Sequence, residues 1–360
     1  MVAYIRTMAV DKNSWLDEET FSDGVALCQM IPGATAMQTA AYVGLKARGV
    51  IGAAASFTGF GLPAFMLMMA LAAVYTRTHS LPVLISIFSG LQAIIVAIVA
   101  NAAFSFGKNT IKNWPALAIA IIAAMLFILN WNPLLVIILA GLGGWVIFKS
   151  TLPDPSQPVH FPRAPSNVKA LLLIVSISTV GFLLLFLSSR TLFNLAALMF
   201  RIDLAAFGGG YASIPLMLHE IVEVRGWLDG TTFMNGIALG QVTPGPIVIT
   251  ATFIGYLFAG PLGGIVATLG IFLPSFLMVI GIAPYFDRLR SSCSFNCIIN
   301  GILCSFVGLL SAVAFRFAVQ VHWDPFHLLL ASGALAALIL QVDILWVVLA
   351  GIVASIFLRI

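Results

Sequence analysis

Two proline–glycine breaks interrupt apolar segments that would otherwise form continuous helices. They are Pro32-Gly33 and Pro244-Gly245-Pro246. Proline removes a backbone donor and glycine relaxes the helical constraint, so each helix is expected to stop and restart there. Inside a membrane such a break persists only where protein or water satisfies the freed backbone groups. The restarted half-helix directs its N–H groups and positive dipole end at that point, which suits an anion; the alternative is a pair of packing kinks.

Neutral hydrogen-bonding side chains lie close to both breaks, and three consecutive glycines follow a separate apolar segment. Together they form the set of candidate binding residues: Gln29, Pro32, Gly33, Thr35, Gln38, Gly208, Gly209, Gly210, Gln241, Thr243, Pro244, Gly245 and Pro246. Consecutive glycines permit close backbone approach or a nest of N–H groups. They match neither GxGxxG nor GxxxxGK[ST], so no nucleotide site is indicated.

Four ionisable residues fall within or near the ends of apolar segments and are functional candidates: Asp23, Arg201, Asp203 and Glu220. Charges inside a membrane are costly and often functional, although a side chain near a helix end can also reach water. His219-Glu220 with Glu223 lacks the second histidine of HExxH, so this stretch is expected to be a solvated face. The sequence predicts no metal site and no cofactor.

The segment around the first break recurs around the second. Eleven of the 19 residues from Trp15 to Gly33 are identical to those 212 positions later, and the match continues at a spacing of 211 through Pro63/Pro274. A duplicated apolar unit with a broken helix is typical of secondary transporters. Only 14 residues precede Trp15, and they contain no glycine cluster. We therefore expect the first unit to be incomplete at its N-terminus, or else to work without that helix.

Composition indicates a polytopic membrane protein. Hydrophobic residues make up 61% of the chain and charged residues only 8%, whereas roughly 25% of residues are charged in a soluble domain. The lipid bilayer is therefore an expected partner. The net charge of +4 comes from scattered basic residues, so a nucleic-acid partner is not indicated.

Apolar runs of spanning length predict about twelve spans, two of them broken. The expected spans are 20–47 (broken), 50–75, 81–104, 115–131, 133–148, 170–187, 191–207, 229–258 (broken), 262–284, 297–318, 326–341 and 344–358. A proline-rich stretch from 150 to 166 separates the repeats. The predicted organisation is a first unit (1–149), a linker with a connecting span (150–190) and a second unit (191–360).

Loop charges favour opposite insertion of the two units, because cytoplasmic loops are enriched in lysine and arginine. If the broken segments cross the membrane, seven crossings separate the two Trp-Leu-Asp motifs, and an odd number inverts the second unit. If they re-enter, six crossings leave the units parallel, and Arg288 and Arg290 fall on the sparsely charged side. The charges therefore favour crossing.

At these residues the chain resembles the chromate ion transporter family. The resemblance covers nearly the whole chain and rests on Trp15-Leu16, Leu27-Cys28-Gln29, Pro32-Gly33, Leu62-Pro63, Phe207-Gly208-Gly209-Gly210-Tyr211, Glu220, Trp227-Leu228, Gln241, Pro244-Gly245-Pro246, Gly255 and Leu273-Pro274-Ser275. It implies two homologous units of opposite orientation and export of chromate from the cytoplasm. The chain departs from the pattern in two places: the first unit lacks the glycine motif, and Ala34 stands where the second unit has Pro246.

These observations predict an all-α polytopic transporter, not an enzyme, with two inverted units in the cytoplasmic membrane. It would move a tetrahedral oxyanion, chromate above all, by alternating access between the two breaks. The alternatives are a sulfate-like anion transporter and an intramembrane enzyme, which would need a catalytic dyad or metal site that the sequence does not reveal. The residues themselves leave open the coupling ion, the direction of transport and whether the chain forms a homo-oligomer.

Overall fold

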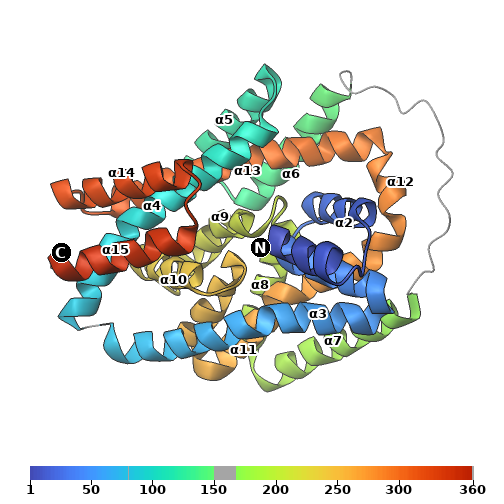
Figure 1. Ribbon diagram of the computed structural model, residues 1–360, viewed down its shortest axis with the longest axis horizontal. Coiled ribbons are helices and arrows are strands. Elements are labelled where there is room, and N and C mark those ends of the chain that lie inside the picture. The colour runs from blue at the N-terminus through green and yellow to red at the C-terminus, as the bar shows by residue number, and fades with distance from the viewer. Residues whose placement is uncertain (80, 150–167, 359–360) are drawn as a thin grey trace.

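The computed structural model describes residues 1–79, 81–149 and 168–358, and every regular element within them is a helix (Figure 1). In chain order the elements are α1 (Val2–Arg6), the π-helix η1 (Thr7–Lys12), α2 (Glu18–Met30), α3 (Thr35–Thr78), α4 (Pro82–Thr110), α5 (Trp114–Ile128), α6 (Pro133–Phe148), α7 (Val168–Ser188), α8 (Arg190–Ala205), η2 (Gly210–Ala212), α9 (Ser213–Met217), the π-helix η3 (Leu218–Val224), α10 (Gly230–Val242), η4 (Ile247–Ile249), α11 (Thr250–Ile282), η5 (Ala283–Tyr285), α12 (Phe286–Arg290), α13 (Cys293–Gln320), α14 (Pro325–Ile339) and α15 (Ile344–Leu358). The expected linker, 150–166, lies outside the described residues.

Within the described residues, five helices are long and apolar enough to cross a membrane. They are α3, α4, α7, the continuous run Ile247–Tyr285 and α13, and four shorter apolar helices (α5, α6, α14 and α15) accompany them. The prediction of an all-α, multi-pass membrane protein is therefore confirmed at this level. The expectation of about twelve spans counted both broken segments as crossings, and their structure is different.

The sequence repeat is matched by repeated backbone geometry. Asp17 and Asp229 cap α2 and α10, with φ/ψ of −77°/165° and −77°/164°. Each carboxylate accepts a 2.7 Å hydrogen bond from the backbone N–H three residues on, which the first helical turn leaves free. Helices α3 and α11 also contain the same sharp kink. In α3 the φ/ψ angles are −143°/28° at Arg48 and 65°/−154° at Gly49. In α11 they are −142°/29° at Ala259 and 64°/−158° at Gly260. The two units therefore fold alike locally.

Each broken segment folds back on itself. In the first, a methyl group added to Gly24 of α2 would lie 2.2 Å from the ring of Tyr42 in α3. In the second, one added to Gly236 would lie 2.5 Å from the ring of Phe253. The members of each pair are nearly equidistant in sequence from their break, so the two half-helices run antiparallel. The sequence-based preference for crossing took each broken segment to continue in one direction. Packing of a ring against a glycine, which loop charges do not report, instead turns the chain back after the break.

The two units exchange their last two helices. Helices α5 and α6 pack against α13 of the second unit, whereas α14 and α15 pack against α4 of the first (Figure 1). Helices α4 and α13 also pack against each other, and α3 packs against α11. The largest cluster of buried hydrophobic residues draws on both units. They therefore share one core, which brings the two breaks close to each other.

Candidate functional site

The glycine cluster Gly208-Gly209-Gly210 lies between the two breaks. A methyl group added to Gly209 would lie 3.1 Å from Thr35 Oγ1, at the restart after the first break. One added to Gly210 would lie 3.1 Å from Ile247 Cγ2, at the restart after the second break. Three segments that are far apart in the sequence thus meet at one place. The sequence had proposed each of them separately as a candidate.

The backbone at this meeting point requires glycine. Gly208 and Gly209 have φ values of +92° and +99°, and Gly33 at the first break has a φ of +116°. L side chains rarely adopt such angles. The N–H of Gly33 donates a 2.9 Å hydrogen bond to the carbonyl of Ala206, two residues before the cluster. The first break is therefore bonded directly to the segment that carries the glycines.

Both restarted half-helices begin beside the glycine cluster. A hydrogen bond from the Gln38 N–H to the Ala34 carbonyl closes the first turn after the first break, and one from Ile249 to Pro246 closes the turn after the second. The opening turn of a helix has N–H groups without intrahelical partners and a partial positive charge. Two positive helix ends consequently converge on the cluster, which suits an anion.

At both breaks a nearby polar side chain forms a hydrogen bond with a backbone carbonyl. Gln38 Nε2 donates a 2.5 Å hydrogen bond to the Pro32 carbonyl, and Thr243 Oγ1 donates a 2.9 Å bond to the Gly240 carbonyl. These bonds satisfy carbonyls that a continuous helix would have used. The break residues Pro32, Gly33, Gly245 and Pro246 are buried. Both breaks are therefore held in place by their own side chains.

Three other candidates differ in how they relate to the cluster. Gln241 Nε2 donates a 3.2 Å hydrogen bond to the hydroxyl of Tyr211, which ties the second break to the residue after the glycines. Gln29 and Pro244 are exposed. The structure therefore brings Gln241 to the cluster and gives Gln29 and Pro244 no buried place in it.

A cavity of about 320 Å³ lies beside the cluster, between α4 and α13. Its lining includes Gly208 and Tyr211 together with three polar side chains of α4, namely Asn101, Ser105 and Asn109. Asn101 is partly buried, whereas Ser105 and Asn109 are exposed, so the polar stripe leads from the surface inward. Sequence analysis missed these residues. Their i, i+4, i+8 spacing, which places them on one face of a helix, was the available signal.

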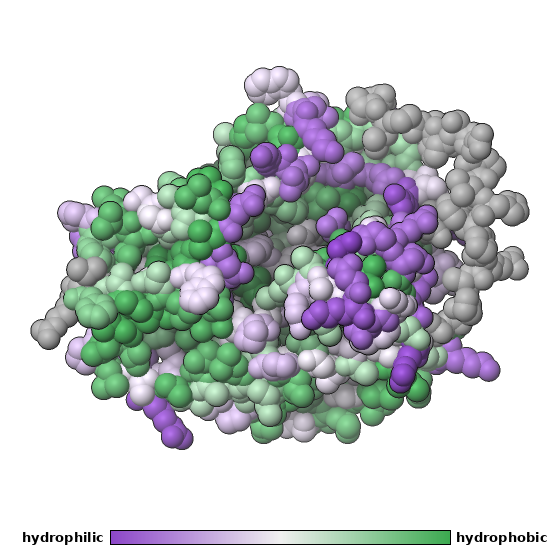
Figure 2. All heavy atoms as spheres, in the orientation of Figure 1, coloured by the Kyte–Doolittle hydropathy of each residue, from purple (hydrophilic) through white to green (hydrophobic). Residues whose placement is uncertain are grey.

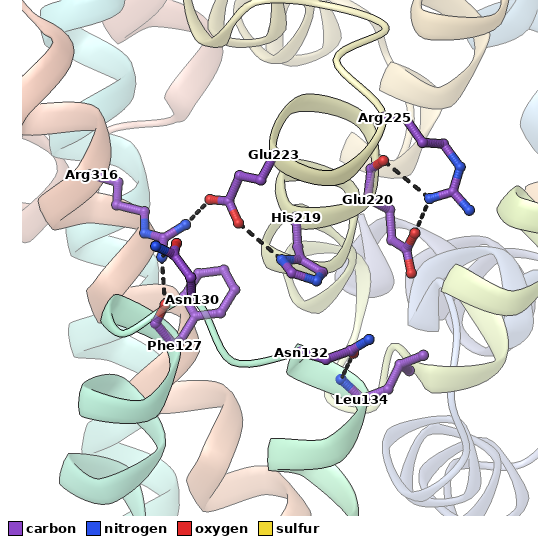
Figure 3. Close-up of polar contacts among 9 residues, drawn as sticks. All are labelled: Phe127, Asn130, Asn132, Leu134, His219, Glu220, Glu223, Arg225 and Arg316. Carbon is purple, nitrogen blue, oxygen red and sulfur yellow. Dashed lines mark hydrogen bonds and ion pairs between the residues drawn. The ribbon is translucent and has the colours of Figure 1, made fainter.

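A buried carboxylate lies behind the cluster, between two arginines. Glu220 of η3 pairs with both Arg201 of α8 and Arg225. Figure 3 shows Glu220 and Arg225 on one side of η3. The Glu220 side chain is only 7% exposed, and that of Arg201 is 50% exposed. The pair joins α8 to η3, so the chain also folds back around the glycine cluster.

A second charged group lies on the other side of η3 (Figure 3). Glu223 pairs with Arg316 of α13 and accepts a 2.9 Å hydrogen bond from His219 Nδ1. Arg316 also donates a 2.8 Å bond to Asn130 Oδ1. His219 and Glu220 are both buried. The expectation of a solvated face here is wrong, because the ion pairs compensate the charges that burial would otherwise penalise.

The two remaining ionisable candidates lie in opposite environments. The Asp23 side chain is 41% exposed and forms a 2.9 Å ion pair with Arg290. Asp203 is fully buried, and its Oδ2 accepts hydrogen bonds from the backbone N–H (2.9 Å) and hydroxyl (2.7 Å) of Ser275. Asp203 therefore does not reach water, which rules out the snorkelling interpretation for this residue.

An aspartate, a histidine and a serine form a hydrogen-bonded chain between α14 and α4, away from the cavity. His327 Nδ1 lies 2.9 Å from Asp324 Oδ1, and its Nε2 lies 2.9 Å from Ser89 Oγ. The order resembles a hydrolase triad. However, Asp324 also caps α14 by accepting hydrogen bonds from the N–H groups of Phe326 and His327. These three side chains therefore have a structural role: they cap α14 and connect it to α4.

The described residues contain no group of three or more histidine, cysteine, aspartate or glutamate side chains that could hold a metal ion. The candidate site consists of two helix restarts, the backbone of the three glycines and neutral donors.

Discontinuous helices that meet within a shared helical core define the class of multi-pass α-helical membrane transporters. The chain belongs to the chromate transporter family, whose model matches residues 1–145 and 193–356.

Several relatives align over most of the chain. It is 42% identical over 353 residues to an uncharacterized transporter of Methanocaldococcus jannaschii, covering 98% of this chain and 88% of the relative. It is 28% identical to a probable chromate transport protein of Synechococcus elongatus (86% and 77% covered) and 27% identical to a chromate transport protein of Pseudomonas aeruginosa (87% and 75% covered). No solved structure matches.

Proposed function

We propose that the protein exports an oxyanion, chromate, across the cytoplasmic membrane by alternating access. The observation that carries this proposal is the meeting of two helix restarts at one glycine cluster beside a polar cavity. N–H groups and helix dipoles can hold a dianion there without a resident cation. The choice of chromate comes from the names of the relatives in Synechococcus and Pseudomonas. Movement of one unit against the other would open the site to each side in turn.

The arginines near the site are paired with glutamates, which favours a site that releases its anion over one that holds it tightly. Arg201 and Arg225 are engaged by Glu220, and Arg316 by Glu223. An anion held by neutral donors alone can be released, and release is as necessary for transport as binding. A tetrahedral dianion of similar size, such as sulfate, would make similar contacts and is the competing substrate.

We further propose that the two units are inserted in opposite orientations, with the nine apolar helices crossing and the broken segments re-entering. In this arrangement α8, which the sequence analysis counted as a span, does not cross, so five crossings (α3 to α7) separate the two Trp-Leu-Asp motifs, and an odd number inverts the second unit. Asp23, in the first half of α2, pairs with Arg290, which precedes α13. Gly230 at the start of α10 instead lies against Gln320, the last residue of α13. The 28 residues of α13 separate these two points. The two broken hairpins therefore begin at opposite ends of one long helix. Figure 2 shows hydrophobic side chains over α14 and α15 and hydrophilic ones over α2 and α12, as expected if α14 and α15 face lipid and the first hairpin begins at an aqueous surface.

Cysteine labelling should reveal this inversion. In a variant in which the four native cysteines are replaced by alanine, single cysteines would be placed at Arg48, Arg288 and Pro261, which are all exposed. We expect an impermeant maleimide to label Arg48→Cys and Arg288→Cys from one side of the membrane and Pro261→Cys from the other. Labelling of all three from the same side would overturn the inverted arrangement.

Counterflow in proteoliposomes tests the transport function itself. Vesicles loaded with unlabelled chromate should take up labelled chromate faster than empty vesicles, and the anion should be recovered chemically unchanged. Counterflow of sulfate without counterflow of chromate would reassign the substrate. Absence of both, or chemical conversion of the anion, would contradict the transporter proposal.

Filling the cavity should impair transport. Asn101→Leu removes a neutral donor and puts an apolar group into the polar stripe, and we expect chromate counterflow to fall roughly tenfold, as a lost hydrogen bond of about 1.4 kcal/mol implies. Asn194→Leu is the matched control, because Asn194 is exposed on α8 and does not line the cavity. Equal rates for the two variants would place the substrate elsewhere.

A further inference from the structure

A buried carboxyl group lies directly behind the first break. Asp203 of α8 is 0% exposed, and its Oδ2 accepts two hydrogen bonds from Ser275 of α11, one from the N–H and one from the hydroxyl. The Ser275 hydroxyl in turn accepts a 3.1 Å hydrogen bond from the N–H of Ala34, where the second half-helix starts. Two consecutive hydrogen bonds therefore join the carboxyl to the backbone of the break.

The other oxygen of this carboxyl has no partner. Among the side chains that the structure describes, two buried polar atoms lack a hydrogen bond, Asp203 Oδ1 and Gln38 Oε1. Gln38 and Ser275, the hydrogen-bond partner of Asp203, both border Gly33, because a methyl group added there would lie 2.0 Å from Ser275 Oγ and 2.7 Å from Gln38 Nε2. Both atoms are acceptors in need of a donor. A proton bound to Asp203 Oδ1 provides a donor there. It also neutralises the carboxylate, whose charge is costly in a buried position.

Among the described residues, the elements packed against Asp203 provide no ion-pair partner for it. Helices α11 and α9 contain no Asp, Glu, Lys, Arg or His. Arg201 lies two residues earlier in α8, but it pairs with Glu220. The remaining charged residues of the neighbouring helices are Arg190 on α8, Lys169 on α7, Glu18, Glu19 and Asp23 on α2, and Lys46, Arg48 and Arg77 on α3. None of them forms an ion pair with Asp203.

We propose that Asp203 is a proton-binding site and that proton binding there is coupled to anion binding at the first break, an inference that rests on the transport function proposed above. Protonation converts Asp203 from a carboxylate to a neutral acid. The ionised form repels a dianion at Ala34, whereas the neutral form does not. Each ligand therefore favours the other, and the two move together. A dianion that leaves with one proton still carries one negative charge outward, which an inside-negative membrane potential favours.

Proton uptake on chromate binding tests this coupling. In weakly buffered detergent solution near neutral pH, the wild-type protein should take up protons when chromate is added. Asp203→Asn, which imitates the neutral acid, should bind chromate without that uptake. Protonation of chromate itself is common to both samples. Asp23→Asn is the matched control and should behave as the wild type, because Asp23 forms an exposed ion pair.

The same variants separate coupling from transport in vesicles. Asp203→Asn should retain chromate counterflow but lose accumulation driven by a pH gradient, and its affinity should lose the roughly tenfold change per pH unit that a single protonation imposes on the wild type. Wild-type counterflow without proton uptake, or with a requirement for Na⁺ instead, would overturn the proton site and leave the transport function intact. If the wild type shows no counterflow of chromate or sulfate, the transport function fails, and this inference fails with it.

Discussion

Gly33→Ala is expected to reduce chromate counterflow by roughly 30-fold or more. The residue has a φ of +116°, and the added methyl group would lie 2.0 Å from Ser275 Oγ. A non-glycine residue in such a backbone conformation costs about 2 kcal/mol, which by itself corresponds to roughly a 30-fold change. The clash must in addition displace Ser275, which bonds both Ala34 and Asp203. The substitution therefore acts on the helix restart that we place at the anion site.

The measurement is the initial rate of labelled chromate counterflow, normalised to the amount of protein in the vesicles. Gly59→Ala is the matched control, since Gly59 also lies in α3 and an added methyl group would meet no atom within 4 Å. It should transport as the wild type does. If Gly33→Ala also transports normally, the first break is a packing kink and contributes nothing to the site.

Glu220→Gln is expected to lower the free energy of unfolding by about 3 kcal/mol, the low end of the cost of breaking a buried ion pair. The carboxylate is 7% exposed and compensates both Arg201 and Arg225. Its removal leaves Arg225, whose side chain is 30% exposed, without its partner. Arg201 can turn toward water because its side chain is half exposed, so we take the lower value. Thermal unfolding of the detergent-solubilised protein should show a clear fall in Tm.

The first unit supplies the control for this experiment. Glu18 pairs with Arg6, but the two side chains are 54% and 43% exposed. An exposed pair contributes about 1 kcal/mol or less, so Glu18→Gln should leave the Tm nearly unchanged. Similar Tm values for Glu220→Gln and Glu18→Gln would mean that the pairs around η3 do not stabilise the fold. Replacing Glu220 should also loosen the hairpin that carries the glycine cluster.

The sequence by itself determined the class of protein and the parts of the candidate site. Long apolar runs can satisfy their backbone in a membrane only as helices, so composition and hydropathy predict the helices. The break at Pro32-Gly33 was visible because proline and glycine act on the backbone locally, whatever surrounds them. The second copy of the motif marked Pro244-Gly245 in the same way. Only the sequence pattern is needed for such local effects.

The tertiary structure alone decided how these parts are arranged. Whether the chain crosses or folds back after a break depends on contacts such as Gly24 with Tyr42, between half-helices, which no local pattern encodes. The polar face of α4 with Asn101 becomes part of the site only because α4 packs beside α13 and the glycine cluster. Glu220 is buried because α8 brings Arg201 to it, while Arg225 approaches from the end of the same π-helix. Burial and pairing are properties of long-range packing, and for that reason the solvated face expected around Glu220 became a buried ion pair.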